Sequence, residues 1–456
     1  MNKQPQISPL MRRLSTYMAG ALKRKLPQAV AERAKLHLVD TFASIISGSR
    51  QLPGKRAIAY IKPLGGTREA GILGTRLVTT TLNAALANGM MCHADETDDT
   101  HPPSRTHPGS SVTPAALAIA EKHQLSGEQM LRAVVLGYDI CARTVLSLKP
   151  NLLVPTGRQA AATGQLYGAA AAAGALLNLT IEQTRYLLSY TLEHTAGLTT
   201  MLRDPHHIEK SYAMSGMPAH NAVAVALMAS QGFTGVEDIF SGEPNFFSIL
   251  SPGADREVLA AGLGSNYEIM RGGIKRWSAG GPCQGPLHVL HEVIQQHGIT
   301  LNDVQKLVAR MPLTEIWVVN DRAMPEISLQ HLLAVMLVDG TLTFASSHDN
   351  ARMKDPRVLK ARKLIHAVAD DTMPTAVRGW RCIMDITLKD GRVISHQTMA
   401  AKGSSDNPLS AREVEEKALD LIVPILGKKR SADLLFALRH IEKLKNVRDL
   451  RKLYVA

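Results

Sequence analysis

Aromatic residues are scarce in this chain, and its few cysteines are widely separated. Phe, Trp and Tyr together make up 4% of the 456 residues, whereas hydrophobic residues as a whole make up 45%. Alanine is abundant, and this composition favours close-packed helices over sheet. No CxxC pair occurs among the four cysteines, which are Cys92, Cys141, Cys283 and Cys382. We therefore expect reduced thiols and a cytoplasmic protein.

Long apolar runs and nucleotide-binding motifs are also missing. The longest run of small apolar residues, Gly168–Leu177, is too short and too rich in alanine to span a bilayer. The N-terminal sequence MNKQPQISPLMRRL has no apolar core, so we expect no secretory signal. Neither GxxxxGKS nor a strand-linked GxGxxG occurs. The sequence therefore predicts a protein without a membrane span or a nucleotide cofactor.

The charge balance is strongly basic. The chain has 52 Lys and Arg residues against 40 Asp and Glu residues, which gives a net charge of +12. A basic protein suits acidic partners such as nucleic acids, anionic membranes or small carboxylates. The basic segment Lys428–Arg451 has few aromatic residues and contains the acids Asp433, Glu442 and Asp449, which favours a solvated helix face over a nucleic-acid groove. We expect a small polycarboxylate as the partner, and nucleic-acid binding through charge alone is the weaker alternative.

Helical spacing of apolar residues dominates the chain to about residue 260. Capping boxes at Ser126–Gln129 and Thr180–Gln183 mark two helix starts, and Thr113-Pro114 has the pattern of a third. The predicted helices are Pro9–Lys25, Val30–Ser47, Ala57–Tyr60 (helix or turn), Val78–Met91, Met130–Ser147, Thr163–Leu177, 180–195 and Pro218–Gln231.

The pattern changes near Arg271. Asp390-Gly391 is a hairpin dipeptide, and residues on both sides of it favour strands. The predicted elements are helices at Pro286–Gln296, Ile327–Val338 and Pro356–Val368, strands at Val304–Met311, Arg378–Leu388 and Arg392–Met399, and a last long helix from the cap at Ser410 to Ile425. The sequence therefore predicts a mainly α protein. A large all-α domain (1–271 plus 403–456) carries an inserted smaller α+β lid domain (272–402).

A polar stretch lies within the helical part, at Met91–Val112, with the sequence MCHADETDDTHPPSRTHPGSSV. Five carboxyl or imidazole side chains fall between His93 and Asp99, and the prolines that follow exclude a long helix. We expect a rigid polar loop between two helices, a kind of segment that often carries catalytic groups. Glu96, Asp98 and Asp99 lie so close together that at least one of them needs a raised pKa or a cationic partner. The candidate partners are His101, His107, Arg105 and Lys275.

The segment HADETDDTHPPSRTHPGSSVTPAALAIAE resembles the signature of the MmgE/PrpD family of dehydratases and decarboxylases. The resemblance continues in GQLYGAAAAAGALLNL, PAHNAVAVALMASQGFTG, Ile274-Lys275 and VNDRAMPEISLQHLLAVMLVDG, and it covers nearly the whole chain. It implies a helical domain with a smaller α+β lid, no metal, and a homodimer formed through the helical domain.

The resemblance also implies site residues. Glu96 occupies the acidic position of the first motif, Asp98, Asp99, Thr100 and His107 match it directly, and Lys275 matches the lysine that opens the second domain. We expect four catalytic residues, which are His107, Lys275, Glu96 and Asp98. We expect six substrate contacts, which are Thr100, Asp99, His101, Gln159, Arg158 and Lys210.

Three positions depart from the family pattern. Many members have G-F-H-P-T where this chain has Gly157–Ala161, so Gln159 replaces the histidine. The lysine before the H-x-G stretch falls at Ser211, with Lys210 one residue away, and the histidine after Lys275 falls at Gly280.

Each candidate also has a structural interpretation. A histidine near neutral pKa can move a proton, and His107 beside Pro108 suits that role, although a loop histidine can also cap a helix end. The acids can be turn or N-cap residues. The spacing of His and Asp matches no standard ligand motif, so we expect no metal. Arg203 and the pair His206-His207 show no diagnostic spacing, and we expect surface or supporting roles for them.

The leading hypothesis is a cofactor-independent lyase, dehydratase-like or decarboxylase-like, that acts on a small di- or tricarboxylate. A proton next to a carboxylate is removed, and cationic side chains stabilise the charge that develops. An epimerase with two bases is the first alternative. A family member that binds carboxylates with altered or no catalysis is the second.

Overall fold

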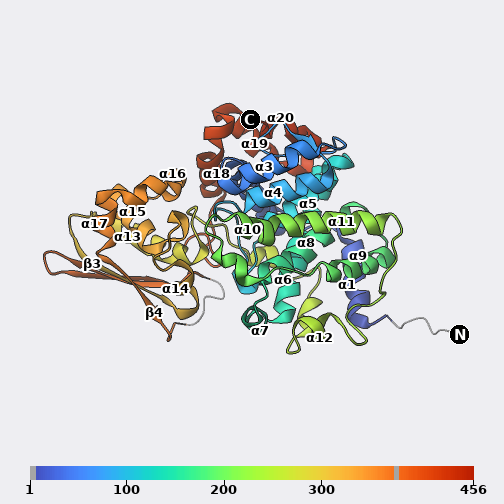
Figure 1. Ribbon diagram of the computed structural model, residues 1–456, viewed down its shortest axis with the longest axis horizontal. Helices are drawn as coiled ribbons and strands as arrows, with labels where there is room; N and C mark the ends of the chain where they lie inside the picture. Colours follow the sequence, from blue (N-terminus) through green and yellow to red (C-terminus); the bar gives the residue numbers. More distant parts are fainter. Residues whose placement is uncertain (1–6, 374–378) are drawn as a thin grey trace. The chain divides into compact units, whose positions relative to one another are not determined.

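The computed structural model describes residues 7–373 and 379–456 and confirms a mainly helical protein (Figure 1). The chain divides into two compact units. The first holds the chain up to Ala94, then Asp99–Gly272 and Leu421–Ala456, and the second holds Asp95–Asp98 and Gly273–Asp420. The predicted functional domains, 1–271 with 403–456 and 272–402, stay a prediction, because compactness alone does not show which segments fold independently.

The first unit is built from helices and one short two-stranded ribbon. Its helices are α1 (Pro9–Ala19), α2 (Gln28–Gly48), α3 (Leu52–Ile61), α4 (Thr81–Cys92), α5 (Gly109–Lys122), α6 (Gly127–Leu148), α7 (Pro150–Leu153), α8 (Ala160–Leu176), α9 (Ile181–Glu193), α10 (Ile208–Ser211), α11 (Met217–Ser230), α12 (Phe246–Leu250), α19 (Lys428–Arg439) and α20 (Arg451–Tyr454). The ribbon pairs β1 (Ala70–Gly71) with β2 (Val78–Thr79) in antiparallel fashion. The predicted helix Val78–Met91 was therefore wrong over its first residues, since Thr80 is the N-cap of α4.

Small residues let the central helices of this unit pack closely. Every residue of α8 is buried, and α8 packs against α6. A Cβ atom added at Gly168 would lie 2.4 Å from the carbonyl oxygen of Gly137, so the two backbones are already in contact. The close-packed helices expected from the composition are confirmed. The four cysteines are buried, and the structure places no disulfide between them.

The start of α5 was predicted five residues too late, because Thr113 was taken as its N-cap and the N-cap is Pro108. The helix begins at Gly109, and Thr113-Pro114 lies inside it. The carboxylate of Asp99 accepts a hydrogen bond from the backbone N–H of Gly109 at 3.1 Å, and it thereby satisfies a donor that the helix itself cannot pair. A helix start that depends on a side chain ten residues away leaves no signal in the local pattern.

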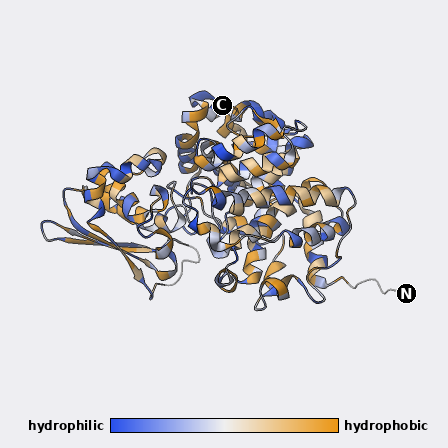
Figure 2. Cartoon of the chain, viewed as in Figure 1, coloured by the Kyte–Doolittle hydropathy of each residue, from blue (hydrophilic) through white to orange (hydrophobic). Residues whose placement is uncertain are grey.

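The second unit contains a four-stranded sheet and several helices. The strand order is β4-β3-β5-β6, where β3 pairs parallel to β4 and antiparallel to β5. The elements are α13 (Gln284–His297), β3 (Val304–Pro312), α14 (Leu313–Val319), α15 (Leu329–Asp339), α16 (Phe344–His348), α17 (Pro356–Arg362), β4 (Ile365–Asp370), β5 (Cys382–Leu388), β6 (Val393–Thr398) and the first part of α18 (Ala411–Leu426). Burial alternates along β5, and the strands carry both apolar and polar residues in Figure 2.

One prediction in this unit is confirmed, and another is wrong over its last residues. The hairpin around Asp390-Gly391 is confirmed, because β5 and β6 pair antiparallel on either side of it. The helix predicted at Pro356–Val368 was wrong at its end, since the chain leaves α17 at Arg362 and forms β4 from Ile365. This segment forms a strand because it pairs with β3, which lies more than fifty residues earlier in the chain. Arg378, the predicted start of the next strand, lies outside the described residues.

The polar stretch is a loop between α4 and α5, as predicted. It enters the second unit at Asp95, returns to the first unit at Asp99, and contains the 3₁₀ turn η3 (Pro102–Ser104). Among the residues described, none of the helices has both the length and the apolar character that a membrane crossing requires.

Candidate active site

The carboxylate of Asp99 accepts three hydrogen bonds within the first unit. Its Oδ2 atom accepts hydrogen bonds from His37 Nδ1 and from the Tyr138 hydroxyl, both at 2.6 Å. Its Oδ1 atom accepts the bond from Gly109 described above. Burial and the nearby carboxylate raise the pKa of Tyr138 well above its usual range, so the tyrosine stays a donor. The carboxylate therefore fixes the loop to α2, α5 and α6.

His107 is held by the backbone of the same aspartate. Its Nδ1 atom lies 2.9 Å from the carbonyl oxygen of Asp99, and its backbone N–H donates to Gln165 Oε1 at 3.1 Å. A carbonyl oxygen can only accept, so Nδ1 carries the hydrogen. In the neutral ring the lone pair is then on Nε2. The half-buried His107 has the tautomer that a base acting through Nε2 requires.

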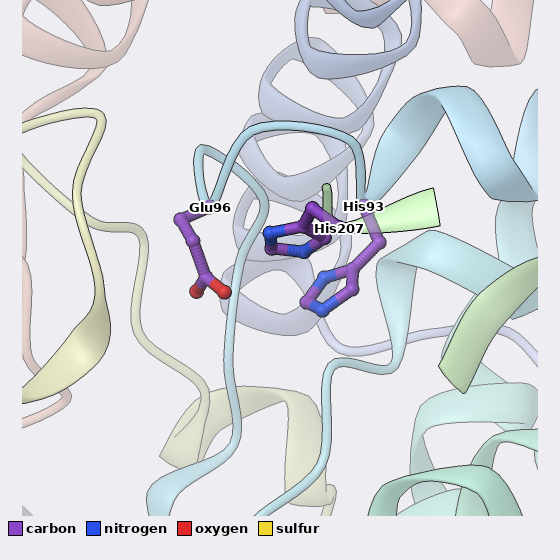
Figure 3. Close-up of side chains that lie close together, drawn as sticks. All are labelled: His93, Glu96 and His207. Atoms are coloured by element: carbon purple, nitrogen blue, oxygen red, sulfur yellow. The ribbon is translucent and has the colours of Figure 1, made fainter. Parts of the chain in front are cut away.

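His93 lies next to two other histidines of the first unit. Its ring packs edge to face against His107, with centroids 4.8 Å apart. It also packs edge to face against His207, with centroids 5.4 Å apart (Figure 3). His207 is buried, so the surface role considered for it was wrong. His93 and His207 are over a hundred positions apart in the sequence, so no motif spacing indicates that they are neighbours. Imidazoles also bind transition metals, and the expected absence of a metal stays a prediction.

His101 belongs to a buried polar network. Its Nδ1 atom is 2.8 Å from Ser104 Oγ, and its Nε2 atom is 3.2 Å from Glu268 Oε2. Arg271 also bonds Glu268, at 2.9 Å. Burial lowers the pKa of His101, with Glu268 acting in the opposite direction. Burial alone would raise the pKa of Glu268, but its bond with His101 and the charge of Arg271 keep that pKa below the usual value.

Backbone bonds close the part of the loop that precedes His107. The His101 N–H donates to the Thr106 carbonyl at 2.8 Å, and Thr100 Oγ1 donates to the same carbonyl at 3.3 Å. These bonds join the two arms of a tight turn around η3. The loop expected from the prolines is confirmed here, whereas its rigidity and the substrate roles of Thr100, Asp99 and His101 stay predictions.

Lys275 is buried in the second unit among the acids of the same loop. Its Nζ atom donates to the Glu96 carbonyl at 2.8 Å and lies 3.6 Å from both Glu96 Oε2 and Asp98 Oδ1. The expected cationic partner for these two acids is therefore Lys275. Glu96 has a φ of 59°, a left-handed conformation that costs a non-glycine residue roughly 1–2 kcal/mol. Strain of this kind is often found at functional sites.

The remaining predicted contacts lie in the first unit and have structural partners. Gln159 is the N-cap of α8, where its Oε1 accepts from the Ala161 N–H at 3.2 Å. The Arg158 guanidinium donates to the carbonyl of Leu250 at 2.8 Å. Lys210 lies in α10, and its N–H is 3.3 Å from Asp204 Oδ2. Their roles toward a substrate stay predictions.

Comparison with known proteins covers almost the full chain. The MmgE/PrpD N-terminal domain matches residues 12–259, and the MmgE/PrpD C-terminal domain matches residues 277–442. The human cis-aconitate decarboxylase is 25% identical, over 95% of this chain and 92% of its own length. The mouse cis-aconitate decarboxylase is 24% identical, over 95% and 91% of the two chains. The cis-aconitate decarboxylase of Aspergillus terreus is 25% identical over 69% of each. Since the two family domains together span most of the sequence, the chain belongs to the MmgE/PrpD family.

Proposed function

We propose that this protein is a cofactor-independent lyase that acts on a small di- or tricarboxylate. Three relatives are named cis-aconitate decarboxylase, and each aligns with more than two thirds of this chain. Their names support a lyase of this substrate class. The observation that carries the mechanism is the hydrogen bond from His107 Nδ1 to the Asp99 carbonyl. This bond leaves Nε2 as the basic nitrogen of the neutral ring. The bond remains favourable when the ring takes up a proton, because Nδ1 still donates.

His107 is the proposed proton-transfer group. In a dehydration, the proton next to a carboxylate moves to Nε2, the C–H electron pair becomes the new C=C bond, and the neighbouring hydroxyl leaves with a proton as water. In a decarboxylation, the C–C bond to a carboxyl group breaks, its electron pair stays on the carbon skeleton, and carbon dioxide leaves. Protonated His107 then delivers a proton to that carbon and takes up another proton from water. Both reactions develop negative charge next to a carboxylate, and fixed cationic groups stabilise such charge.

Lys275 is the proposed cationic group, with Glu96 and Asp98 as its partners. Two acids 3.6 Å from the ammonium stabilise its charged form and fix its direction. We propose that Lys275 binds a substrate carboxylate or carries a proton, and that Glu96 and Asp98 orient it. The proposed substrate contacts remain Thr100, Asp99, His101, Arg158, Gln159 and Lys210.

The test is turnover of a panel of acids followed by proton NMR. The panel holds cis-aconitate and citrate-like, tartrate-like and aspartate-derived diacids. For an acid that the wild type converts, we expect His107→Ala to lower kcat about 10²–10⁴-fold, the usual contribution of a general base. His123→Ala is the control, because His123 is an exposed histidine that follows α5. Equal activity of the two variants would remove His107 from the mechanism.

A second candidate is an epimerase that exchanges one proton without releasing water or carbon dioxide. It is favoured by Gln159, which stands where the resembling members have a histidine and which serves here as a helix cap. In deuterated water, an epimerase incorporates deuterium next to the carboxylate while the carbon skeleton stays intact. If the acids raise the melting temperature but no reaction occurs, a carboxylate-binding member without catalysis is the better description.

Three further properties belong to the same proposal. We propose a homodimer, a cytoplasmic location and a lid role for residues 272–402. Light scattering after size exclusion tests the first, and the mass of a monomer would contradict it. Cell fractionation tests the second, and solution scattering with and without a bound carboxylate tests the third.

A further inference from the structure

Three consecutive backbone carbonyls of the loop each accept a hydrogen bond from a different side chain of the second unit. His348 Nε2 lies 2.9 Å from the Asp95 carbonyl, Lys275 Nζ lies 2.8 Å from the Glu96 carbonyl, and Lys417 Nζ lies 2.9 Å from the Thr97 carbonyl. The three donors come from separate elements. His348 ends α16, Lys275 precedes the 3₁₀ turn η9 (Gly281–Cys283), and Lys417 lies in α18.

The segment Asp95–Asp98 has little structure of its own to keep this shape. It lies outside every helix and strand, and the local bond that crosses it runs from the Thr97 N–H to Asp95 Oδ1 at 3.2 Å. Glu96 is left-handed, a conformation that persists only where the surroundings hold it. Two of the donors, Lys275 and Lys417, are ammonium groups, and hydrogen bonds from charged donors are about twice as strong as neutral ones. The three donors are therefore well suited to hold the direction of the Glu96 and Asp98 side chains.

We propose that His348 and Lys417 are positioning residues, which hold the 95–98 turn by its backbone so that Glu96 and Asp98 stay directed at Lys275. This inference rests on the proposed function of Lys275, Glu96 and Asp98. Lys275 takes part in both arrangements, because its ammonium contacts a carbonyl and both carboxylates. His348 and Lys417 contact the backbone of the turn, and their contribution can be measured apart from the acids.

The geometry of each positioning residue suggests a selective substitution. The ring of His348 stacks on Phe344 with centroids 4.3 Å apart, so His348→Phe keeps an aromatic ring in place and removes the donor. Lys417 is half-buried in α18, so Lys417→Met keeps the length of the side chain and removes the ammonium. Lys417→Arg restores a cationic donor. The controls are His366→Phe on β4 and Lys360→Met on α17, both exposed residues of the same unit.

The primary measurement is amide hydrogen exchange, followed by mass spectrometry, in peptides that cover residues 93–101. We expect exchange to accelerate about tenfold or more in Lys417→Met, the effect of losing one hydrogen bond to a charged group, and about twofold or more in His348→Phe, which loses an imidazole donor. Lys417→Arg and both controls should exchange like the wild type. Peptides from β3 and β5 report whether each variant is folded. Unchanged exchange in folded Lys417→Met and His348→Phe would overturn the inference.

Kinetics supply the second measurement, with an acid that the wild type converts. Because a positioning residue acts on the reacting groups without contacting the substrate, we expect kcat to fall about tenfold in Lys417→Met while KM changes less than threefold. Lys417→Arg should recover most of the loss. A wild type that converts none of the acids would refute the proposed function, and the exchange measurement would still decide whether the turn is held in this way. A fall in kcat without faster exchange would overturn the positioning role.

Discussion

Asp98 and Asp99 are neighbours in the sequence, yet they are bonded in different ways in different units. The carboxylate of Asp99 accepts from three donors of the first unit, which are His37, Tyr138 and the Gly109 N–H. The carboxylate of Asp98 lies 3.6 Å from Lys275 in the second unit. One aspartate thus joins helices and starts α5, whereas the other faces a buried ammonium. The same residue type serves structure at one position and, in our proposal, chemistry at the next.

The comparison shows why residue type and spacing do not assign roles within such a loop. The motif presents Asp98 and Asp99 as equivalent acids, and the family resemblance matched both. The partners that separate them come from residues 37, 109, 138 and 275. A carboxylate whose bonds are already directed at protein donors has less capacity left for a ligand. We therefore expect stability to depend on Asp99 and activity to depend on Asp98.

The largest expected effect is the loss of Asp99. Asp99→Ala leaves the His37 ring, the Tyr138 hydroxyl and the Gly109 N–H without their shared acceptor inside the protein. Each buried donor left without its acceptor costs about 1–3 kcal/mol of unfolding free energy, and three donors lose theirs here. Urea denaturation followed by circular dichroism measures this loss.

Asp98→Asn is the matched variant for that experiment. It keeps the size of the side chain and removes the charge near Lys275, which retains Glu96 at 3.6 Å and the Glu96 carbonyl at 2.8 Å. We expect a smaller loss of stability than for Asp99→Ala and a larger loss of kcat relative to the remaining folded protein. If Asp98→Asn destabilises the protein as much as Asp99→Ala, the division between the two aspartates is wrong.

A third buried aspartate sharpens the comparison through pH. Asp139 accepts bonds from the Tyr17 hydroxyl and the Glu268 N–H, both at 2.6 Å, and burial raises its pKa from 3.8 to about 6. Between pH 4 and 6 the folded protein therefore keeps a proton that the unfolded chain has released. Stability falls as pH rises through this window, by at most about 3 kcal/mol from Asp139 alone, and no further above it.

The Asp139 contribution is isolated by comparison with Asp139→Asn, which cannot titrate. The unfolding free energy of each protein is measured by urea denaturation at intervals from pH 4 to pH 8. The variant should gain stability relative to the wild type as pH rises from 4 to 6, and the difference should then stay constant. If the difference in unfolding free energy between the two proteins does not change with pH, Asp139 is ionised throughout this range. Its pKa is then not raised, as for a carboxylate with a cationic partner.

Much of the fold followed from the sequence, because its signals are local. Helical periodicity and capping boxes predicted most helices of the first unit, and Asp390-Gly391 predicted the hairpin. The errors occurred where distant residues decide the structure. β4 forms because β3 pairs with it, and α5 starts early because Asp99 reaches Gly109. No periodicity within either segment reports those partners.

In the candidate site, too, the sequence indicated the residues of the motif but not the distant residues that hold them. The loop and its acids were expected from charge density and the family motif, and Lys275 was one of four candidate cationic partners. His37 and Tyr138, which hold Asp99, lie 62 and 39 residues from it and resemble ordinary helix residues in the sequence. His348 and Lys417 bind backbone carbonyls, and every residue type has such a carbonyl. Contacts of that kind leave no pattern that a single sequence can reveal.

The smallest expected effect is the loss of one donor to Asp99. Tyr138→Phe removes the hydroxyl 2.6 Å from Oδ2, while His37 and the Gly109 N–H remain. A hydrogen bond to a charged acceptor contributes about 1.5–3 kcal/mol, and the edge-to-face contact between His37 and the ring at position 138, with centroids 5.3 Å apart, is kept. We expect urea denaturation to show a loss near the lower end of that range, with kcat changed less than in Asp98→Asn. A loss of kcat larger than in Asp98→Asn would mean that the Asp99 region acts in the chemistry as well as in the fold.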